Sequence, residues 1–168
     1  MSGPRRFLVA LAGTEDVTLA DQVAQVIGAA DADVEVTLLH VEDTGPRELA
    51  AHDPMIRRGP WPHHSESIVQ QRLTAADEQE AASLLAAWHD RFASALPGVK
   101  IAHLVVSGRP EQEIVAAAAR LKPDALILCP RPRSGHSEPG PRSVGHVARF
   151  VLDHSPVPVL LIRRAAEL

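Results

Sequence analysis

The stretch ALILCPRPRSGHSEPGPRSVGHVARFVLDHSPVPVLLIR, residues 125–163, contains a strand, a loop, a helix and a second strand. The continuous apolar run at 125–129 predicts a strand buried on both faces, as in a parallel sheet. The helix predicted over 143–155 has its apolar face at Val144, Val147 and Val151. A second strand is predicted at 157–164, and it is apolar as far as Ile162. This order predicts two parallel strands joined by a right-handed crossover.

The same alternation runs through the rest of the chain. Strands are predicted at 7–13, 33–41 and 99–106, and helices at 14–30, 65–96 and 108–124. Residues 42–64 form an irregular connection rich in Pro, Gly and charge. Regular alternation predicts an α/β protein with a doubly wound, five-stranded parallel sheet and helices on both faces. The 168 residues are expected to form a single domain, 1–168.

Two of the predicted helices carry specific signals. The helix at 65–96 repeats large apolar residues every four positions, at Leu84, Trp88, Phe92 and Leu96, with Ser65 as its expected N-cap. In the helix at 108–124, Pro110 suits the first turn, and Glu111 and Glu113 suit the positive end of the helix dipole. The apolar stripe is expected to pack in the core.

Composition excludes several classes of function. The net charge of −4 gives no general attraction to nucleic acid or to an anionic membrane. Three Phe, two Trp and no Tyr leave few rings on which bases might stack. No run approaches the roughly 20 apolar residues of a membrane span, and the apolar run near the N-terminus is too short for a signal peptide. A cytoplasmic location is expected, and the single cysteine, Cys129, fits a reducing compartment.

Several segments resemble the universal stress protein family. They are FLVALAGTED at 7–16, VTLLHV at 36–41, VVSGRPEQEIVAAAA at 105–119 and GHVARFVLDHSPVPVLLIR at 145–163. The resemblance implies the strand order 3-2-1-4-5 of the adenine nucleotide alpha hydrolase-like fold. It also implies a homodimer paired through the last strand, here Val157 to Ile162. Edge strands need a partner or a cover, so this implication agrees with the apolar character of that strand.

The resemblance also implies where a nucleotide would bind. Members that bind ATP carry an aspartate after the first strand, and three glycines spaced by two and nine residues, followed by Ser or Thr. Here Ala12 stands at the aspartate position, followed by Gly13 and Thr14. Val41 and Gly108 match two further positions of the site.

The loop after the fourth strand aligns with the glycine motif in two ways. Without a gap from the last helix, Gly135 and Gly145 are the second and third glycines, and Pro132 replaces the first. Anchored on the RSG tripeptide, the loop is three residues longer, and Cys129 and Pro132 replace the first two glycines. In both alignments His146 follows the last glycine in place of a hydroxyl residue.

These departures predict a degenerate nucleotide site. Proline has no N–H to offer a phosphate, and a side chain blocks the close approach that glycine permits. The expected protein is a non-catalytic, homodimeric stress-response protein that binds ATP weakly or not at all, with no cofactor. Two alternatives stay open: an ATP-binding member acting as a nucleotide-dependent signalling module, and a weak nucleotide hydrolase.

Four further features bear on the chemistry of the chain. Cys129 is expected to be a buried apolar residue, and the alternative is a reactive thiol beside Arg131 and Arg133. Those arginines and Arg142 are expected to be solvated, and the alternative is that they hold an anion. The histidines between 52 and 64 lack the spacing of a zinc motif, so no metal is expected. No G-x-S-x-G sequence is present, and no catalytic residue is predicted.

Overall fold

The structure is a computed structural model that describes residues 3–11, 18–28, 33–44, 64–129 and 144–162. Strands and helices alternate in the predicted order. They are β1 (Arg5–Leu11), α1 (Thr18–Gly28), β2 (Val34–Asp43), α3 (His64–Ala95), β3 (Lys100–Gly108), α4 (Pro110–Leu121), β4 (Ala125–Leu128), α5 (His146–His154) and β5 (Val159–Leu161). Helix α3 begins one residue before Ser65, so the prediction of that residue as its N-cap is wrong.

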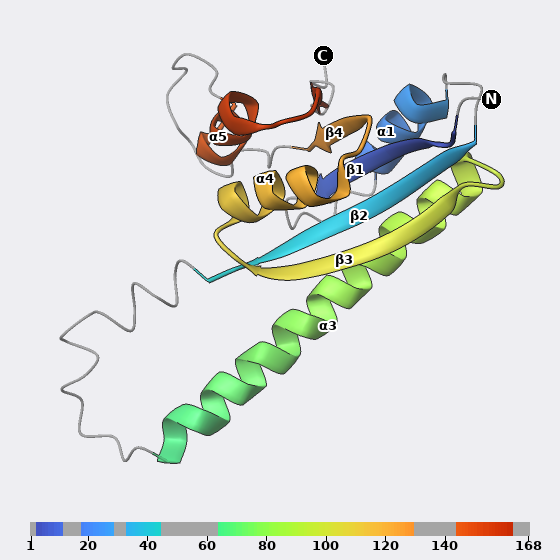
Figure 1. Ribbon diagram of the computed structural model, residues 1–168. Coiled ribbons are helices and arrows are strands. Elements are labelled where there is room, and N and C mark those ends of the chain that lie inside the picture. The colour runs from blue at the N-terminus through green and yellow to red at the C-terminus, as the bar shows by residue number, and fades with distance from the viewer. Residues whose placement is uncertain (1–2, 12–17, 29–32, 45–63, 130–143, 163–168) are drawn as a thin grey trace, which may run out of the picture.

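The strands form one parallel sheet in the order β3-β2-β1-β4-β5, which confirms the predicted fold (Figure 1). Strand β1 is central and pairs with β2 on one side and β4 on the other. Its five buried residues, Phe7 to Leu11, are apolar on both faces, as a strand covered by helices on both sides must be. Strands β3 and β5 are the edges of the sheet.

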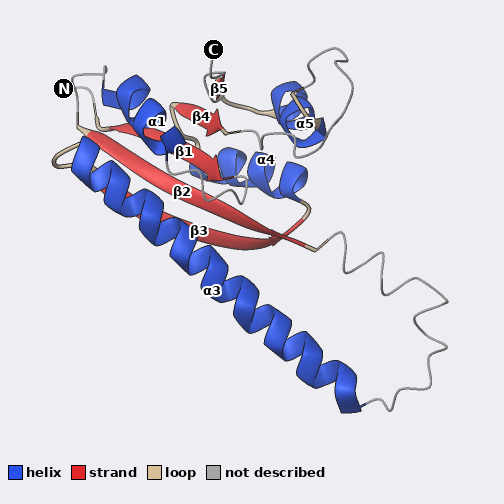
Figure 2. Ribbon diagram, turned by 180° about the vertical axis from the view of Figure 1, so that it is seen from behind, coloured by secondary structure: helices blue, strands red, loops and turns tan. Residues whose placement is uncertain are grey.

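One face of the sheet is covered by α1 and α3 (Figure 2). The apolar stripe that the sequence predicts for α3 packs on this face. Trp88 is 1% exposed and Phe92 is 0% exposed. The two rings stack with their centroids 6.0 Å apart. Figure 2 shows the first turns of α3 extending beyond the sheet, so its C-terminal half forms the packed part.

The other face is covered by α4 and α5. Small and branched residues of the two helices pack on β1, β2 and β4 there, at Ile114, Ala117, Ala118, Ala148 and Val151. Pro110 occupies the first turn of α4, as predicted, and Lys122 ends the helix in the left-handed region at φ 47°.

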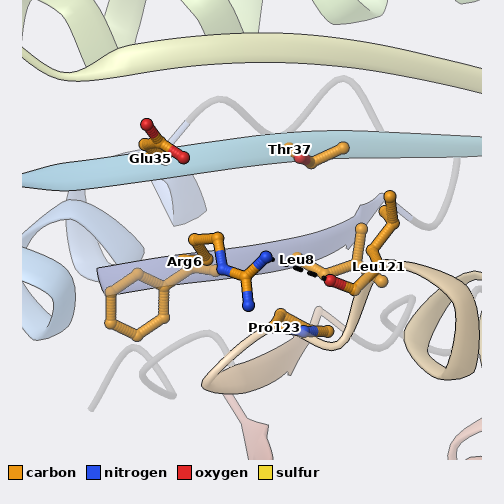
Figure 3. A pocket seen from close by; sticks show the side chains of 7 residues that line it. Arg6, Leu8, Glu35, Thr37, Leu121 and Pro123 are labelled. Atoms are coloured by element: carbon orange, nitrogen blue, oxygen red, sulfur yellow. Dashed lines mark hydrogen bonds between the residues drawn. The ribbon is translucent and has the colours of Figure 1, made fainter. Parts of the chain in front are cut away.

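The Arg6 side chain, at the start of β1, forms hydrogen bonds with the end of α4. Its guanidinium donates hydrogen bonds to the carbonyl oxygens of Leu121 (3.5 Å) and Lys122 (2.9 Å), which lie beyond the last intrahelical bonds. Figure 3 shows the bond to Leu121. Arg6 and Leu121 also line a hollow of about 100 Å³ at the amino ends of the strands. Ligand pockets for drug-sized molecules start at roughly 300 Å³, so the arginine has a structural role here.

Truncating the α3 stripe tests its contribution to the core. We expect Phe92→Ala to lower the free energy of unfolding by about 3–5 kcal/mol, because the substitution leaves a cavity against Trp88. Urea denaturation followed by circular dichroism measures this change. Asp90→Ala, on the exposed side of the same turn, is the matched control and should shift stability by about 0.5 kcal/mol or less. Equal effects of the two substitutions would contradict the packing described.

The single cysteine offers a second test. Cys129 is 3% exposed, and burial raises the pKa of its thiol to about 12. We expect the native protein to react with a disulfide reagent at pH 8 at least ~100-fold more slowly than the chain unfolded in guanidinium chloride, since the thiolate is the nucleophile. A native rate near that of the unfolded chain would revive the reactive-thiol hypothesis.

Candidate functional site

The candidate site is the crevice at the carboxyl ends of the strands. In open parallel sheets, ligands bind outside these ends, where the strand order changes direction. Here the order changes between β1 and β4, because β2 and β3 lie on one side of β1 and β5 lies on the other. The starts of α4 and α5 come to the same edge, after β3 and after the connection that follows β4.

Strands β2 and β3 extend past β1 and form one wall of the crevice. Leu11, the last residue of β1, pairs with His40, so Val41, Glu42 and Asp43 lie beyond it. The wall is held by two contacts. The Ser107 hydroxyl donates a hydrogen bond of 2.7 Å to Glu42 Oε2, and Thr44 N–H donates one of 3.2 Å to the Gly108 carbonyl.

Gly108 lies where β3 turns into α4, and its lack of a side chain permits a close approach. A Cβ placed there would lie 2.7 Å from Glu113 Oε1 and 2.8 Å from Glu113 Cγ. Both distances are shorter than real Cβ contacts, so a larger residue would push Glu113 away from the turn. The glycine predicted as a binding residue therefore has a packing role in the turn that carries α4 to the crevice.

Glu111 lies in the first turn of α4 and is the only buried charged residue in the part of the chain that the structure describes. Its side chain is 10% exposed. Oε1 lies 3.4 Å from Arg109 Nε, and Oε2 lies 3.7 Å from His146 Nε2, at the first residue of α5. The carboxylate therefore joins the N-terminal ends of the two helices.

Sequence reasoning assigned Glu111 only to the dipole of its own helix. The contact with His146 crosses 35 positions and depends on how α4 packs against α5, which the local pattern does not contain. The sequence signal for this role of Glu111 is its position directly after Pro110, the first residue of α4.

Four of the predicted binding residues are brought to this edge. Val41 is half-buried and packs against the apolar cluster under α4 and α5. Gly108 ends β3. Gly145 precedes α5 at φ 86°, in the left-handed region that favours glycine. His146 follows it, with its side chain 81% exposed.

The other predicted binding residues lie outside the described residues. They are Ala12, Gly13, Thr14, Pro132, Arg133 and Gly135. The histidine-rich stretch from His52 to His63 lies outside them too. Within the described ranges, no group of three or more His, Cys, Asp or Glu side chains is placed to hold a metal ion. None of the helices described is long and apolar enough to cross a membrane.

His40 lies in β2, three residues before its end and in register with Leu11, and it is half-buried. Burial lowers the pKa of its imidazole below the usual value, and the carboxylates of Glu42 and Glu80 partly oppose this shift. The lowered pKa favours the neutral form of this imidazole.

The chain was compared with known proteins at the level of sequence families and of solved structures. The family model described as the universal stress protein family matches residues 3–163. No curated protein matches the chain significantly.

Solved universal stress proteins share the fold over nearly the whole chain. UspA from Lactobacillus plantarum is 21% identical, with a TM-score of 0.67, over 97% of this chain and 100% of that one. A family member from Arabidopsis thaliana with AMP bound is 18% identical, with a TM-score of 0.60, over 97% and 94%. A universal stress protein in complex with cAMP is 19% identical, with a TM-score of 0.56, over 96% and 98%. The strand order, the crevice and the family match agree, and the chain belongs to the universal stress protein family.

Proposed function

We propose that the protein is a non-catalytic, homodimeric stress-response protein whose crevice binds ATP weakly or not at all. Family membership sets adenine nucleotides as the ligand class to consider, because relatives have been solved with AMP and with cAMP. A cytoplasmic location belongs to the same proposal.

The acidic character of the described crevice edge carries this proposal. Glu42 and Asp43 end β2, and Glu111 lies in the first turn of α4. Two like unit charges ~5 Å apart repel by about 3 kcal/mol at an effective dielectric constant of ~20. The carboxylates at this edge therefore oppose a triphosphate more strongly than a neutral molecule, to the extent that the Arg109 guanidinium beside Glu111 does not offset their charge.

The start of α5 supports the same conclusion. In members that bind ATP, a hydroxyl residue follows the last glycine of the motif, whereas here His146 follows Gly145. The imidazole is near Glu111 and is largely exposed. In either alignment Pro132 replaces one of the first two glycines of the motif, and this substitution removes a further N–H donor that a phosphate needs.

A non-catalytic role is supported by the chemistry of the described edge. The thiol at the end of β4, Cys129, is buried with a raised pKa, which opposes a role as a nucleophile. The Glu42 carboxylate accepts a hydrogen bond from Ser107, and the Glu111 carboxylate contacts Arg109 and His146.

Isothermal titration calorimetry tests nucleotide binding directly. We expect no measurable heat when the protein is titrated with millimolar ATP and magnesium, because the acidic edge opposes the phosphates. Mass spectrometry of the purified protein should likewise find no retained nucleotide. Binding in the micromolar range would overturn the proposed function in favour of the ATP-binding alternative.

The dimer is proposed to form through β5. This strand is an edge of the sheet, with Leu160 38% exposed on it. We expect light scattering to give twice the chain mass of 18.0 kDa, and Leu160→Lys to give the monomer, because a lysine in the contact lacks a partner. Val105→Lys is the matched control. Val105 is 45% exposed on the opposite edge strand, β3. If Val105→Lys gives the monomer and Leu160→Lys does not, the dimer interface lies at β3, and the proposal of a β5 interface is wrong.

A further inference from the structure

Two histidines from α3 and β3 lie in contact beside the sheet, away from its carboxyl edge. His89 Nδ1 lies 3.1 Å from His103 Nε2. The rings are nearly perpendicular, at 88°, with their centroids 5.1 Å apart. His103 is in register with Leu38 of β2, and Leu38 is in register with Val9 of β1, so the pair lies level with the middle of the sheet. The proposed function makes no use of this pair.

The residues next to each ring along the chain fix its position. Leu85 and Phe92, one turn before and one turn after His89 on the same side of α3, are buried against the sheet. On β3, Ile101 packs against the same apolar cluster. His103 shares the face of Ile101, because side chains two positions apart in a strand point to the same face. The two rings are therefore held close together before any ligand binds, which lowers the entropic cost of binding one ligand to both.

The separation of the two nitrogen atoms suits a shared metal ion. Zinc binds imidazole nitrogen at about 2.0–2.1 Å with tetrahedral geometry, so two of its nitrogen ligands lie about 3.3 Å apart. The observed distance of 3.1 Å is close to this value. His103 is exposed and His89 is half-buried, so both rings can turn about their terminal torsions until the two lone pairs meet at one ion.

The protonation of the pair is also compatible with a metal. In the hydrogen bond between two neutral rings, an N–H of one histidine faces the unprotonated nitrogen of the other. Coordination requires this proton to move to the outer nitrogen of the same ring, so both rings stay neutral and no proton is lost. Burial, and then the neighbouring His89, lower the pKa of the His103 imidazole, which favours the neutral form that a metal requires.

We propose that His89 and His103 form a binding site for one divalent metal ion of the zinc and copper class. Imidazole is a ligand that Zn²⁺ and Cu²⁺ favour, whereas Mg²⁺ and Ca²⁺ take oxygen ligands. Since the described residues contain no group of three or more His, Cys, Asp or Glu placed to hold a metal, the pair supplies two ligands and water completes the coordination. Ala86 and Ala93, one turn to either side of His89, are small and exposed and leave room for that water. This proposal is independent of the proposed function.

Zinc titration of the full chain at neutral pH, followed by competition with a chromogenic zinc indicator, tests the site. We expect the wild-type protein to bind one zinc ion at this pair in the micromolar range, and an excess of magnesium not to displace it. His89→Asn and His103→Gln each place an amide near the ring nitrogen of the pair, so they can keep a hydrogen bond and lose the metal ligand. Each variant should lower zinc affinity at least ~10-fold. Absence of zinc binding by the wild-type protein at submillimolar concentration would overturn the proposal.

His154→Gln is the matched control for the number of histidines. His154 is exposed at the end of α5, and its Nδ1 lies 2.8 Å from the Phe150 carbonyl oxygen. This variant removes one imidazole from the chain, as each test variant does, and leaves the pair intact. It should leave zinc affinity unaltered. An equal loss with His154→Gln, or no loss with His89→Asn and His103→Gln, would assign zinc binding to other histidines and refute the site.

Copper supplies a readout that locates the site within the chain. Cu²⁺ binds a given nitrogen site more tightly than Zn²⁺, and it is paramagnetic, so it broadens the NMR signals of nearby nuclei. Substoichiometric Cu²⁺ should first broaden the backbone amide signals around His89 and His103. This measurement needs no substitution, so it decides the matter if a variant does not fold. Broadening confined to other segments of the chain would show that the pair is not the metal site.

Discussion

The pairing of β1 with both β2 and β4 is the constraint on which the rest of the structure depends. A strand with parallel neighbours on both sides must bury both of its faces, and Phe7 to Leu11 supply apolar side chains to each. Helices α1 and α3 then cover one face, and α4 and α5 cover the other. Since all strands run the same way, every strand ends at one edge, which is where ligands bind in open parallel sheets.

Parallel pairing also determines which ends of the helix dipoles lie at that edge. Each connection returns through a helix, so the helices start where the strands end, and their positive ends converge on the crevice. Most proteins with this arrangement can offer these ends to an anionic ligand. Here the first turn of α4 itself contains a carboxylate, Glu111, two positions after Arg109.

The fold was predictable because its signals are local. Unbroken apolar runs identify strands buried on both faces, and the stripe at Leu84, Trp88 and Phe92 identifies the packed side of α3. The strand order came from the family resemblance, since periodicity alone does not specify which strands are neighbours. The candidate site was less predictable. The glycine spacing drew attention to Gly145, but the contact of His146 with Glu111 depends on the approach of two helices distant in sequence.

The buried carboxylate changes what the starts of α4 and α5 require from the rest of the chain. The positive end of a helix dipole is stabilised by a nearby negative charge. Glu111 supplies such a charge from within the first turn of α4, and its Oε2 lies 3.7 Å from His146 Nε2 at the first residue of α5. Because Oε1 also lies 3.4 Å from Arg109 Nε, the charge of this side chain is offset although the side chain is only 10% exposed. The starts of the two helices are therefore stabilised by a residue of the chain itself.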